Sequence, residues 1–341
     1  MPASDGGEAG RRKETRLPAT ELESSLGTTN DGEFVEVVEV GTRDGLQIES
    51  TVVPTNQKIT LLDKIIASGV RHIEVTAFVS PKAVPQLADA EEVIAGLGRR
   101  SDVNLMALVP NLRAAERACA TALNGGVLLC SASESHNRKN LNRSIAESLA
   151  GFPAIADKLR EAGIDVLGGM AVAFGCPFEG DVPHDSVLRI ATTYAELGVR
   201  HLTLGDTTGM ATPRNIRSLV QKLRLEFPQI ELTLHLHNTR GIGLANVLVG
   251  LGLGIRRFDA ATGGTGGCPF APGATGNIST EDLVYLLEES GYRTGIDLDR
   301  SIDAAKTMER LLGKPLPGQV MHAGPRLKLH PLESVRSAVG G

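Results

Sequence analysis

The chain has 341 residues, 41% of them hydrophobic, which is enough for a full core in one large α/β domain or in two ordinary domains. The net charge of -5 and an aromatic content of 3% without Trp argue against a nucleic-acid groove or a base-stacking surface. No apolar run reaches the ~18 to 20 residues of a membrane span. The 4 scattered cysteines fit a reducing compartment better than a disulfide scaffold or a CxxC zinc site. We therefore expect a cytoplasmic protein that has neither a nucleic-acid nor a membrane partner.

The N-terminal segment is polar and lacks the apolar centre of a signal peptide. Arg11, Arg12, Lys13 and Arg16 could indicate a transit peptide, but glutamates interrupt them. We therefore predict that residues 1–32 form a disordered tail.

From Phe34 onward, short apolar runs alternate with longer amphipathic segments. The apolar runs predict strands at 34–40, 71–76, 103–109, 126–130, 165–174, 200–204, 231–237 and 257–261. The amphipathic segments predict helices at 55–68, 84–97, 112–123, 144–162, 186–197, 213–227, 244–251 and 280–289. About eight β/α units in roughly 260 residues are typical of an α/β fold of the (β/α)8 TIM-barrel type, with a doubly wound sheet as the competing architecture.

Polar residues with chemical potential follow many different strands rather than one neighbouring pair. A barrel gathers the C-terminal ends of all its strands around one mouth, whereas an open sheet gathers only those at its switch point. We therefore predict a TIM-barrel catalytic domain over residues 33–298. A helix over 300–312 and a Pro/Gly-rich stretch then form a short C-terminal helical extension, residues 299–341.

His235 and His237 lie at the end of a predicted strand, where residues i and i+2 point to the same face. Two converging imidazoles form half of a divalent metal site, although a hydrogen-bonded pair at a strand end has the same sequence pattern. Asp44, after the first strand, and Asn277, after the last, would complete a set of nitrogen and oxygen ligands. Such a set favours Mg²⁺ or Mn²⁺, with Zn²⁺ or Co²⁺ as alternatives.

Several other residues near the strand ends could carry chemistry. Arg43 and Asp44 either form a turn salt bridge or supply a guanidinium and a carboxylate to an active site. Glu74 lies in an apolar strand and needs a partner such as Arg43 or the metal site. Asp206 is a further acid in a Gly-containing turn. Cys268, in a Gly-rich loop, is either a buried core residue or a thiol on a mobile lid.

Six stretches together resemble the 3-hydroxy-3-methylglutaryl-CoA lyase family, part of a wider group of metal-dependent barrels that includes isopropylmalate and homocitrate synthases. The stretches are Glu39–Gln47, Ile73–Lys82, Gly175–Gly180, Leu204–Thr207, His235–His237 and Gly266–Asn277. The resemblance covers about residues 34–298, and the last stretch is a long and specific signature.

The resemblance implies a metal-dependent retro-Claisen reaction. The substrate would be 3-hydroxy-3-methylglutaryl-CoA, or a related 3-hydroxy-3-alkylglutaryl-CoA, and the products would be a 3-oxo acid and acetyl-CoA. A role in leucine degradation follows from the same resemblance. The metal ligands that it implies are Asp44, His235, His237 and Asn277.

The resemblance also implies roles for residues around the metal. Arg43 would stabilise the enolate of the departing acetyl-CoA. Glu74, Gln47 and Asp206 would order the surroundings of the metal, bind substrate or move protons. Cys268 would lie near the reacting carbon. The general base and the general acid stay open at this point, with Asp44 or another acid near the metal as the candidate base.

Basic residues near the mouth are candidates for contacts with the substrate. Lys82, Arg138 and Lys139 follow strands two and four, where they either meet CoA phosphates or are solvated surface residues. The animal-type lyases of the family continue the second histidine with Asp-Thr-Tyr-Gly, whereas this chain has Asn238 and Arg240 at the two variable positions. These changes remove a charge beside the metal and add a cation near the mouth, so they allow a longer or differently charged acyl chain.

Two other functions compete with the lyase. One is a Claisen-condensing synthase of the same group, although synthases usually carry a large further domain where this chain has residues 299–341. The other is a non-catalytic protein that binds a metal or a CoA ester, which the full ligand set together with Arg43 and Cys268 disfavours. We expect an acyl-CoA substrate and assembly into a homodimer or a higher homo-oligomer.

Overall fold

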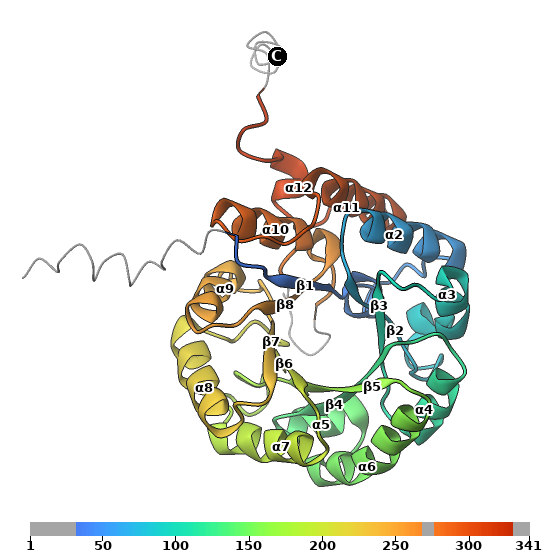
Figure 1. Ribbon diagram of the computed structural model, residues 1–341, viewed down its shortest axis with the longest axis vertical. Coiled ribbons are helices and arrows are strands. Elements are labelled where there is room, and N and C mark those ends of the chain that lie inside the picture. The colour runs from blue at the N-terminus through green and yellow to red at the C-terminus, as the bar shows by residue number, and fades with distance from the viewer. Residues whose placement is uncertain (1–31, 268–275, 330–341) are drawn as a thin grey trace, which may run out of the picture.

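Eight parallel strands form a closed barrel in the computed structural model, which describes residues 32–267 and 276–329 (Figure 1). The strands pair in sequence order, and β1 pairs with β8 to close the ring. Their bounds are β1 (Glu36–Glu39), β2 (His72–Ala77), β3 (Asn104–Leu108), β4 (Gly125–Ser131), β5 (Asp165–Ala171), β6 (His201–Gly205), β7 (Glu231–His235) and β8 (Arg257–Ala260). The predicted (β/α)8 TIM barrel is therefore confirmed, and the competing doubly wound sheet is wrong.

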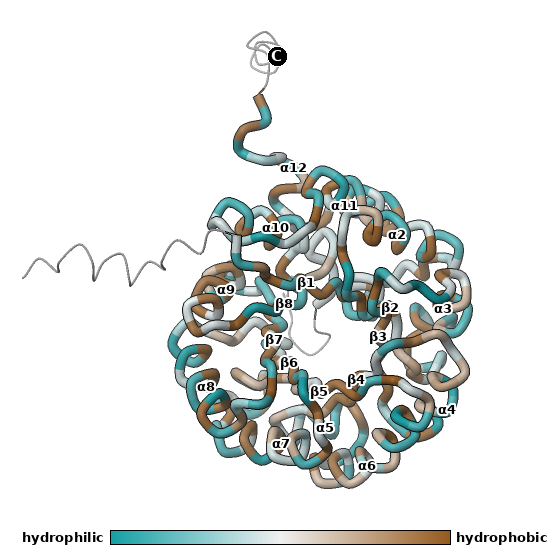
Figure 2. Tube along the Cα trace, in the orientation of Figure 1, coloured by the Kyte–Doolittle hydropathy of each residue, from teal (hydrophilic) through white to brown (hydrophobic). Residues whose placement is uncertain are grey.

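An outer ring of helices surrounds the strands (Figure 1). The helices that follow the strands in turn are α2 (Thr55–Ala67), α3 (Ala90–Leu97), α4 (Leu112–Cys119), α6 (Ile145–Glu161), α7 (His184–Glu196), α8 (Pro213–Glu226), α9 (Gly243–Gly252) and α10 (Thr280–Glu289). Figure 2 shows hydrophilic and hydrophobic residues alternating along these helices, as expected for elements with one buried face. The main core lies between strands and helices, where Leu128, Tyr194 and Phe258 are fully buried.

Two more helices, α11 (Leu298–Leu312) and α12 (Val320–Ala323), follow the last β/α unit. Helix α11 lies between α10 and α2 in the outer ring and contacts both (Figure 1). The sequence predicts its start at residue 300, whereas the helix begins at Leu298 because Asp297 caps it. The Asp297 side chain accepts a hydrogen bond of 3.1 Å from the backbone N–H of Arg300.

Some predictions concern residues that the structure does not describe. The predicted tail 1–32 lies, apart from Gly32, outside the described ranges, so it stays a prediction. The predicted bounds of the barrel domain and of the extension also stay predictions.

None of the helices within 32–267 and 276–329 combines the length and the apolar character that crossing a bilayer requires.

One predicted helix is divided in the structure. Residues 84–97 form a short 3-10 turn, Pro85–Leu87, followed by α3. Asp89 lies between the two elements, and its carboxylate accepts hydrogen bonds from Lys58 Nζ at 2.6 Å and from Thr55 Oγ1 at 2.7 Å. These contacts with α2 fix Asp89 outside a helix, a constraint that the local sequence does not show.

A further helix, α5 (Glu134–Leu141), follows β4 and has no counterpart among the predictions. It is polar up to its last residue, Leu141, and lacks the apolar face that identifies a helix in a sequence. Polar contacts hold it instead. Ser133 caps its first turn, and Asn137 Nδ2 donates to the carbonyl of Arg143 and to the hydroxyl of Ser148, each at 2.9 Å.

A buried carboxylate joins the loops at the seam where the barrel closes. Glu39, the last residue of β1, is fully buried and accepts hydrogen bonds from the backbone N–H of Gly41 at 2.6 Å and of Thr262 at 2.9 Å. It also accepts hydrogen bonds from the hydroxyls of Thr262 at 2.8 Å and of Thr280 at 2.6 Å. One carboxylate thus satisfies donors from the loops after both β1 and β8.

A hydroxyl in the core provides a test of the packing between β4, β5 and α7. The Tyr194 hydroxyl is fully buried and lies 2.8 Å from the carbonyl oxygens of both Leu128 and Gly169. We expect Tyr194→Phe to lower the free energy of unfolding by about 1–3 kcal/mol, because two buried acceptors lose their donor. Urea denaturation followed by circular dichroism measures the change. The partly buried Tyr285 provides the control variant Tyr285→Phe, and equal losses in both variants would contradict the prediction.

Glu281 makes stability depend on pH. Burial, helped by the negative charges of Asp282 and Glu39, raises the pKa of Glu281 to about 8, whereas the ordinary pKa of such a group is 4.5. Unfolding therefore releases a proton between these two values. The contribution of Glu281 to the free energy of unfolding is fully present below about pH 4.5 and falls as the pH rises to about 8.

The variant Glu281→Gln keeps a neutral side chain at every pH. We expect the difference in its free energy of unfolding between pH 5 and pH 8 to be smaller than that of the unmodified protein by ~2 kcal/mol. Urea titrations at the two pH values measure this difference. The exposed Glu226 provides the control variant Glu226→Gln, which should keep the original pH dependence, and an unchanged dependence in Glu281→Gln would refute the assignment.

Candidate metal centre and active site

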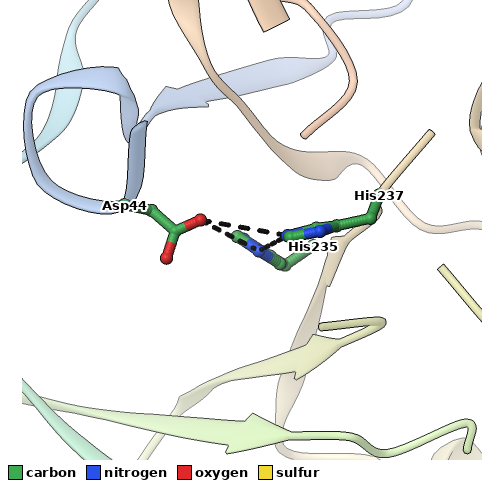
Figure 3. Close-up of side chains that lie close together, drawn as sticks. All are labelled: Asp44, His235 and His237. Atoms are coloured by element: carbon green, nitrogen blue, oxygen red, sulfur yellow. Dashed lines mark hydrogen bonds and ion pairs between the residues drawn. The ribbon is translucent and has the colours of Figure 1, made fainter. Parts of the chain in front are cut away.

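Three ligating side chains converge at the mouth of the barrel (Figure 3). His235 ends β7 and His237 follows two residues later, and their Nε2 atoms lie 3.1 Å apart. The Oδ2 atom of Asp44 lies 3.9 Å from each of these nitrogens. One ligating atom from each residue can therefore reach a common point, since all lie within 4.8 Å of one another.

Asp44 reaches the histidines because the chain turns sharply after β1. The turn η1 (Gly41–Gly45) is of the π type, and the N–H groups of Arg43, Asp44 and Gly45 all approach the carbonyl of Val40, at 3.1, 2.8 and 3.2 Å. A side chain at Gly45 would collide with the hydroxyl of Thr265. Glycine at this position therefore lets the loop after β8 lie against the turn that carries Asp44.

The charges and free acceptors of this cluster suit a divalent cation. Three buried or half-buried carboxylates, those of Asp44, Glu74 and Asp259, face one guanidinium, that of Arg43, so negative charge is in excess. The buried amide oxygen of Asn277 has no hydrogen-bond partner among the described residues. Buried excess charge and an unpaired acceptor are both costly, and a bound cation would relieve both costs.

The surroundings of the two histidines affect their protonation in opposite ways. His235 Nδ1 lies 3.2 Å from Asp259 Oδ2, which orients the ring and leaves Nε2 facing Asp44. Burial lowers the pKa of His235, but the hydrogen bond to Asp259 and the charge of Asp44 outweigh it and raise this pKa. Burial and the neighbouring His235 lower the pKa of His237 to about 3, so this imidazole is neutral near pH 7.

Asp44 is held as a carboxylate. Burial raises its pKa, but the charge of Arg43 and the two imidazoles more than offset this and lower the pKa of Asp44 to about 2. Asn277 Nδ2 donates to Asp44 Oδ2 at 2.8 Å and to the carbonyl of Thr265 at 3.0 Å. In this orientation Asn277 fixes Asp44, and its own oxygen is the atom that it would offer to a metal.

Arg43 is clamped beside the three ligands. Its Nε and Nη2 lie 2.8 and 2.9 Å from the two carboxylate oxygens of Glu74, and its Nη1 lies 2.6 Å from Asp44 Oδ1. Burial lowers the pKa of Arg43, but Glu74 and Asp44 outweigh it and raise this pKa, so the guanidinium stays charged. A bidentate pair of this kind fixes the plane of the guanidinium as well as its position.

Asp206 directly follows β6 and lies next to the cluster. Its backbone N–H donates to the carbonyl of His235 at 2.8 Å, and its Oδ1 accepts from the N–H of Ala211 at 2.8 Å. The side chain is buried, and burial raises the pKa of Asp206 to about 7. A carboxyl group with this pKa can accept and return a proton near neutral pH.

A cavity of about 530 Å³ leads from the mouth into the lumen of the barrel. Arg43, Asp44 and both histidines line its upper part, and so does Gln47, which the sequence predicts as a substrate-binding residue. The polar cluster and the cavity therefore form one site, with the ligating atoms at its wall.

The predicted basic rim residues lie outside this cavity. Lys82 follows β2 and Lys139 lies on α5, and both are exposed. Arg138 Nη2 pairs with Glu134 at 2.8 Å on the surface of α5. Lys82, in the loop after β2, and Lys139, on α5 after β4, thus both follow the C-terminal ends of strands, which keeps them as candidates for contacts with a large substrate.

Arg240 has a contact that the sequence does not reveal. Its Nη1 donates to the carbonyl oxygens of Thr208 at 3.0 Å and Gly209 at 2.7 Å, and it thereby joins the loops after β6 and β7. A direct role in binding substrate stays a prediction for Arg240. Cys268 lies outside the described residues, so its predicted place near the reacting carbon is also untested.

Sequence reasoning missed three residues that shape the site. Asp259 orients His235, Glu39 joins the loops at the seam, and His136 of α5 lines the cavity. The signal for Asp259 is present in the sequence, because an acid inside an apolar strand is costly without a partner, as for Glu74. His136 has no such signal, since α5 itself has no apolar face.

Comparisons with known sequences agree with this geometry. The sequence profile of the HMGL-like family matches residues 34–308. A hydroxymethylglutaryl-CoA lyase of Bacillus subtilis is 42% identical over 84% of this chain and 95% of its own length. The human mitochondrial hydroxymethylglutaryl-CoA lyase is 39% identical over 88% of this chain and 92% of its length. An (R)-citramalyl-CoA lyase of Chloroflexus aurantiacus is 42% identical over 86% of this chain and 96% of its length.

Solved structures give the same result. An HMG-CoA lyase of Acinetobacter baumannii, in complex with coenzyme A and 3-methylmalate, is 48% identical with a TM-score of 0.84 and covers 88% of this chain and 98% of its own. The Bacillus subtilis HMG-CoA lyase is 41% identical with a TM-score of 0.83, and the match covers 86% of this chain and 98% of that enzyme's chain. The chain therefore belongs to the HMGL-like family, and it is a carbon–carbon lyase.

Proposed function

We propose that this lyase cleaves 3-hydroxy-3-methylglutaryl-CoA to acetoacetate and acetyl-CoA. The observation that carries the proposal is the placement of a charged arginine directly beside a cluster of two histidines and one carboxylate. Arg43 lies 2.6 Å from Asp44, which in turn lies 3.9 Å from both imidazoles. The site can thus hold a cation for a substrate oxygen and a second positive charge for a developing oxyanion.

We assign the cation to Asp44, His235 and His237, with the amide oxygen of Asn277 as the fourth protein ligand. When bound, a divalent metal would polarise the tertiary hydroxyl of the substrate and lower its pKa. Nitrogen and oxygen donors with open positions favour Mg²⁺ or Mn²⁺ over a structural Zn²⁺ site. Zn²⁺ and Co²⁺ are the alternatives, and metal-loading experiments would separate the four ions.

The chain's own residues account for the movement of protons and charge. Two carboxyl groups are available to take the hydroxyl proton: Glu74, which lines the cavity, and Asp206, whose pKa is about 7. As the bond between C2 and C3 of the substrate breaks, C3 becomes a ketone and the electron pair passes to the thioester enolate. Arg43 donates its hydrogen bonds toward that oxyanion, and protonation of C2 gives acetyl-CoA.

The long CoA arm has one exit from the site. Coenzyme A is too large for the lumen, so it must leave through the mouth, where Lys82 and Lys139 are exposed. We propose that these lysines attract the CoA phosphates. Cytoplasmic location and assembly into a homodimer or a higher homo-oligomer remain our proposals from the sequence.

The name of one relative points to a second candidate substrate. The Chloroflexus aurantiacus enzyme that shares 42% identity is an (R)-citramalyl-CoA lyase. Citramalyl-CoA carries its carboxylate directly on C3, one CH₂ shorter than 3-hydroxy-3-methylglutaryl-CoA, so the same metal and arginine could serve both thioesters.

The products distinguish the two substrates. We expect the metal-loaded protein to cleave 3-hydroxy-3-methylglutaryl-CoA with a kcat/KM at least ~10-fold above that for citramalyl-CoA. One methylene between the two substrates can produce a difference of this size in kcat/KM. Coupled assays for acetoacetate and for pyruvate measure the two reactions. A preference for pyruvate formation would make citramalyl-CoA the substrate, and no cleavage of either thioester would refute the proposed function.

Loss of a ligand should remove both the metal and the activity. We expect Asp44→Asn and His235→Ala each to weaken binding of Mn²⁺ by at least ~100-fold and to lower kcat by a similar factor. Isothermal titration calorimetry with Mn²⁺ measures binding independently of turnover. The control is His184→Ala on α7, far from the cluster in sequence. Unchanged Mn²⁺ affinity in either ligand variant would remove that residue from the metal site.

A further inference from the structure

A short segment joins α11 to α12 and lies against the seam where the barrel closes. It comprises residues 314–319, which we call the C-terminal strap, and it has no regular secondary structure. Pro315 and Pro317 restrict its backbone, and Leu316 between them is only 5% exposed. Connecting segments usually run over the surface, so a buried leucine between two prolines indicates a specific contact.

The strap contacts the loop after β8. The backbone N–H of Gly318 donates to the carbonyl of Gly263 at 3.1 Å. A Cβ added at Gly263 would collide with Leu316 Cδ1, and one added at Gly264 would lie 3.1 Å from Pro317 Cγ. Both of these loop glycines have a φ of +70°. The loop therefore makes its turn with no side chain of its own between its backbone and the strap.

The strap also contacts the loop after β1. Lys314 Nζ lies 2.6 Å from Glu49 Oε2. Glu49 is buried, whereas Lys314 reaches it from the surface. The N–H of Glu49 donates to the carbonyl of Leu46 at 3.1 Å, directly after the η1 turn that carries Asp44. A buried carboxylate is costly without a partner, so this ion pair ties the strap to the β1 loop.

The outer ring of helices holds the strap in place. Asp282 of α10 accepts hydrogen bonds from the backbone N–H groups of Gln319 at 3.0 Å and of Val320 at 2.7 Å. His322 Nε2 of α12 lies 3.1 Å from the carbonyl oxygen of Leu316. The strap is thus fixed at its far end to helices, while its other residues contact the two loops at the seam.

A continuous series of contacts leads from the strap to the candidate metal ligands. Thr265 follows Gly264 directly, and its hydroxyl donates to the carbonyl of Thr262 at 3.1 Å. The carbonyl of Thr265 accepts a hydrogen bond from Asn277 Nδ2 at 3.0 Å, and the same Nδ2 donates to Asp44 Oδ2 at 2.8 Å. A displacement of the turn after β8 would therefore move groups that hold two candidate ligands.

We propose that Leu316 is a positioning residue for the metal centre. By packing on Gly263, it holds the loops after β8 and β1 at the separation at which Asn277 and Asp44 can bind one ion. The inference rests on the proposed metal-dependent function, and it extends that function to a segment beyond the last β/α unit. The coupling is reciprocal: a strap that favours metal binding is itself held more firmly, by the same factor, when the metal is bound.

The variant Leu316→Ala removes most of the contact with Gly263 and leaves every candidate ligand unchanged. We expect its affinity for Mn²⁺ to fall at least ~5-fold, measured by isothermal titration calorimetry on the full-length protein. We expect kcat at subsaturating Mn²⁺ to fall as well, while KM for the thioester changes less than ~2-fold, because the strap acts on the ligands. The volume-conserving variant Leu316→Met should keep the Mn²⁺ affinity within ~2-fold.

Controls separate positioning from a general loss of stability. Leu159→Ala removes a fully buried leucine of α6, so it should lower the free energy of unfolding but keep the Mn²⁺ affinity. Leu327→Ala, at a position that is 68% exposed beyond the strap, should keep both. Lys314→Gln loosens the strap at its other contact and should weaken Mn²⁺ binding at least ~2-fold. It carries the test if Leu316→Ala does not fold by circular dichroism.

Hydrogen exchange tests the reciprocal effect without turnover. In the unmodified protein, saturating Mn²⁺ should slow exchange at least ~5-fold in the peptide that contains Gly318, whose N–H is bonded to Gly263. The ligand variant His235→Ala should show no such slowing at the same Mn²⁺ concentration, because it lacks the ion that stabilises the strap.

The outcomes distinguish this inference from the proposed function. An unchanged Mn²⁺ affinity in both strap variants, or an equal loss in Leu159→Ala, would overturn the role of Leu316 and leave the metal site intact. Exchange at Gly318 that does not respond to Mn²⁺ would also overturn it. If the unmodified protein binds no Mn²⁺ and cleaves no thioester, the proposed function itself would be refuted.

Discussion

The carboxylate of Glu39 holds together the part of the molecule on which the site depends. The barrel closes where β1 meets β8, and the loops after these two strands carry Asp44 and Asn277, which lie 233 positions apart in the chain. Glu39 is fully buried between the two loops and accepts hydrogen bonds from both. A buried carboxylate is costly unless donors surround it, so its four hydrogen bonds also specify one arrangement of the seam.

The candidate metal centre extends this use of buried charge. Glu74 and Asp44 share the guanidinium of Arg43, and Asp259 orients His235 from the opposite side. Each of these groups would be unfavourable alone in the interior, and each is satisfied by its neighbours. The remaining excess of negative charge is what a divalent cation would balance. Positioning and electrostatics therefore arise from the same contacts, and removing one partner would disturb both.

The lumen shows the opposite principle, because there the structure leaves space unfilled. On the outside of β5, Gly168 packs against the ring of Tyr194, whereas the adjacent residue, Gly169, lines the cavity on the inside. The fold gains its stability between strands and helices, where the main core lies. The cavity inside the barrel is thus available to a substrate, and Arg257 in its lining pairs with Glu36 at 2.8 Å.

Much of the architecture and the convergence of three candidate ligands could be predicted from sequence, because both depend on local pattern. Eight alternations of apolar runs and amphipathic segments are sufficient to predict a barrel, and a period of two places His235 and His237 on one face. The strand ends of a barrel meet at one mouth, so Asp44 could be assigned to the same centre before any distance was known. The resemblance to a known family added roles for Arg43 and Asn277.

Contacts between distant segments could not be predicted, because local pattern contains no distances. The polar helix α5 depends on hydrogen bonds made by Asn137, and it carries no periodic signal of its own. Arg240 donates to the carbonyls of Thr208 and Gly209 after β6, a contact between two loops that has no local signal in the sequence. Gly169 is one of two adjacent glycines, and only the closed barrel decides that it faces the lumen while its neighbour packs against Tyr194. The sequence by itself thus determined the elements and the ligand types, whereas barrel closure decided their distances, their charges and the shape of the space between them.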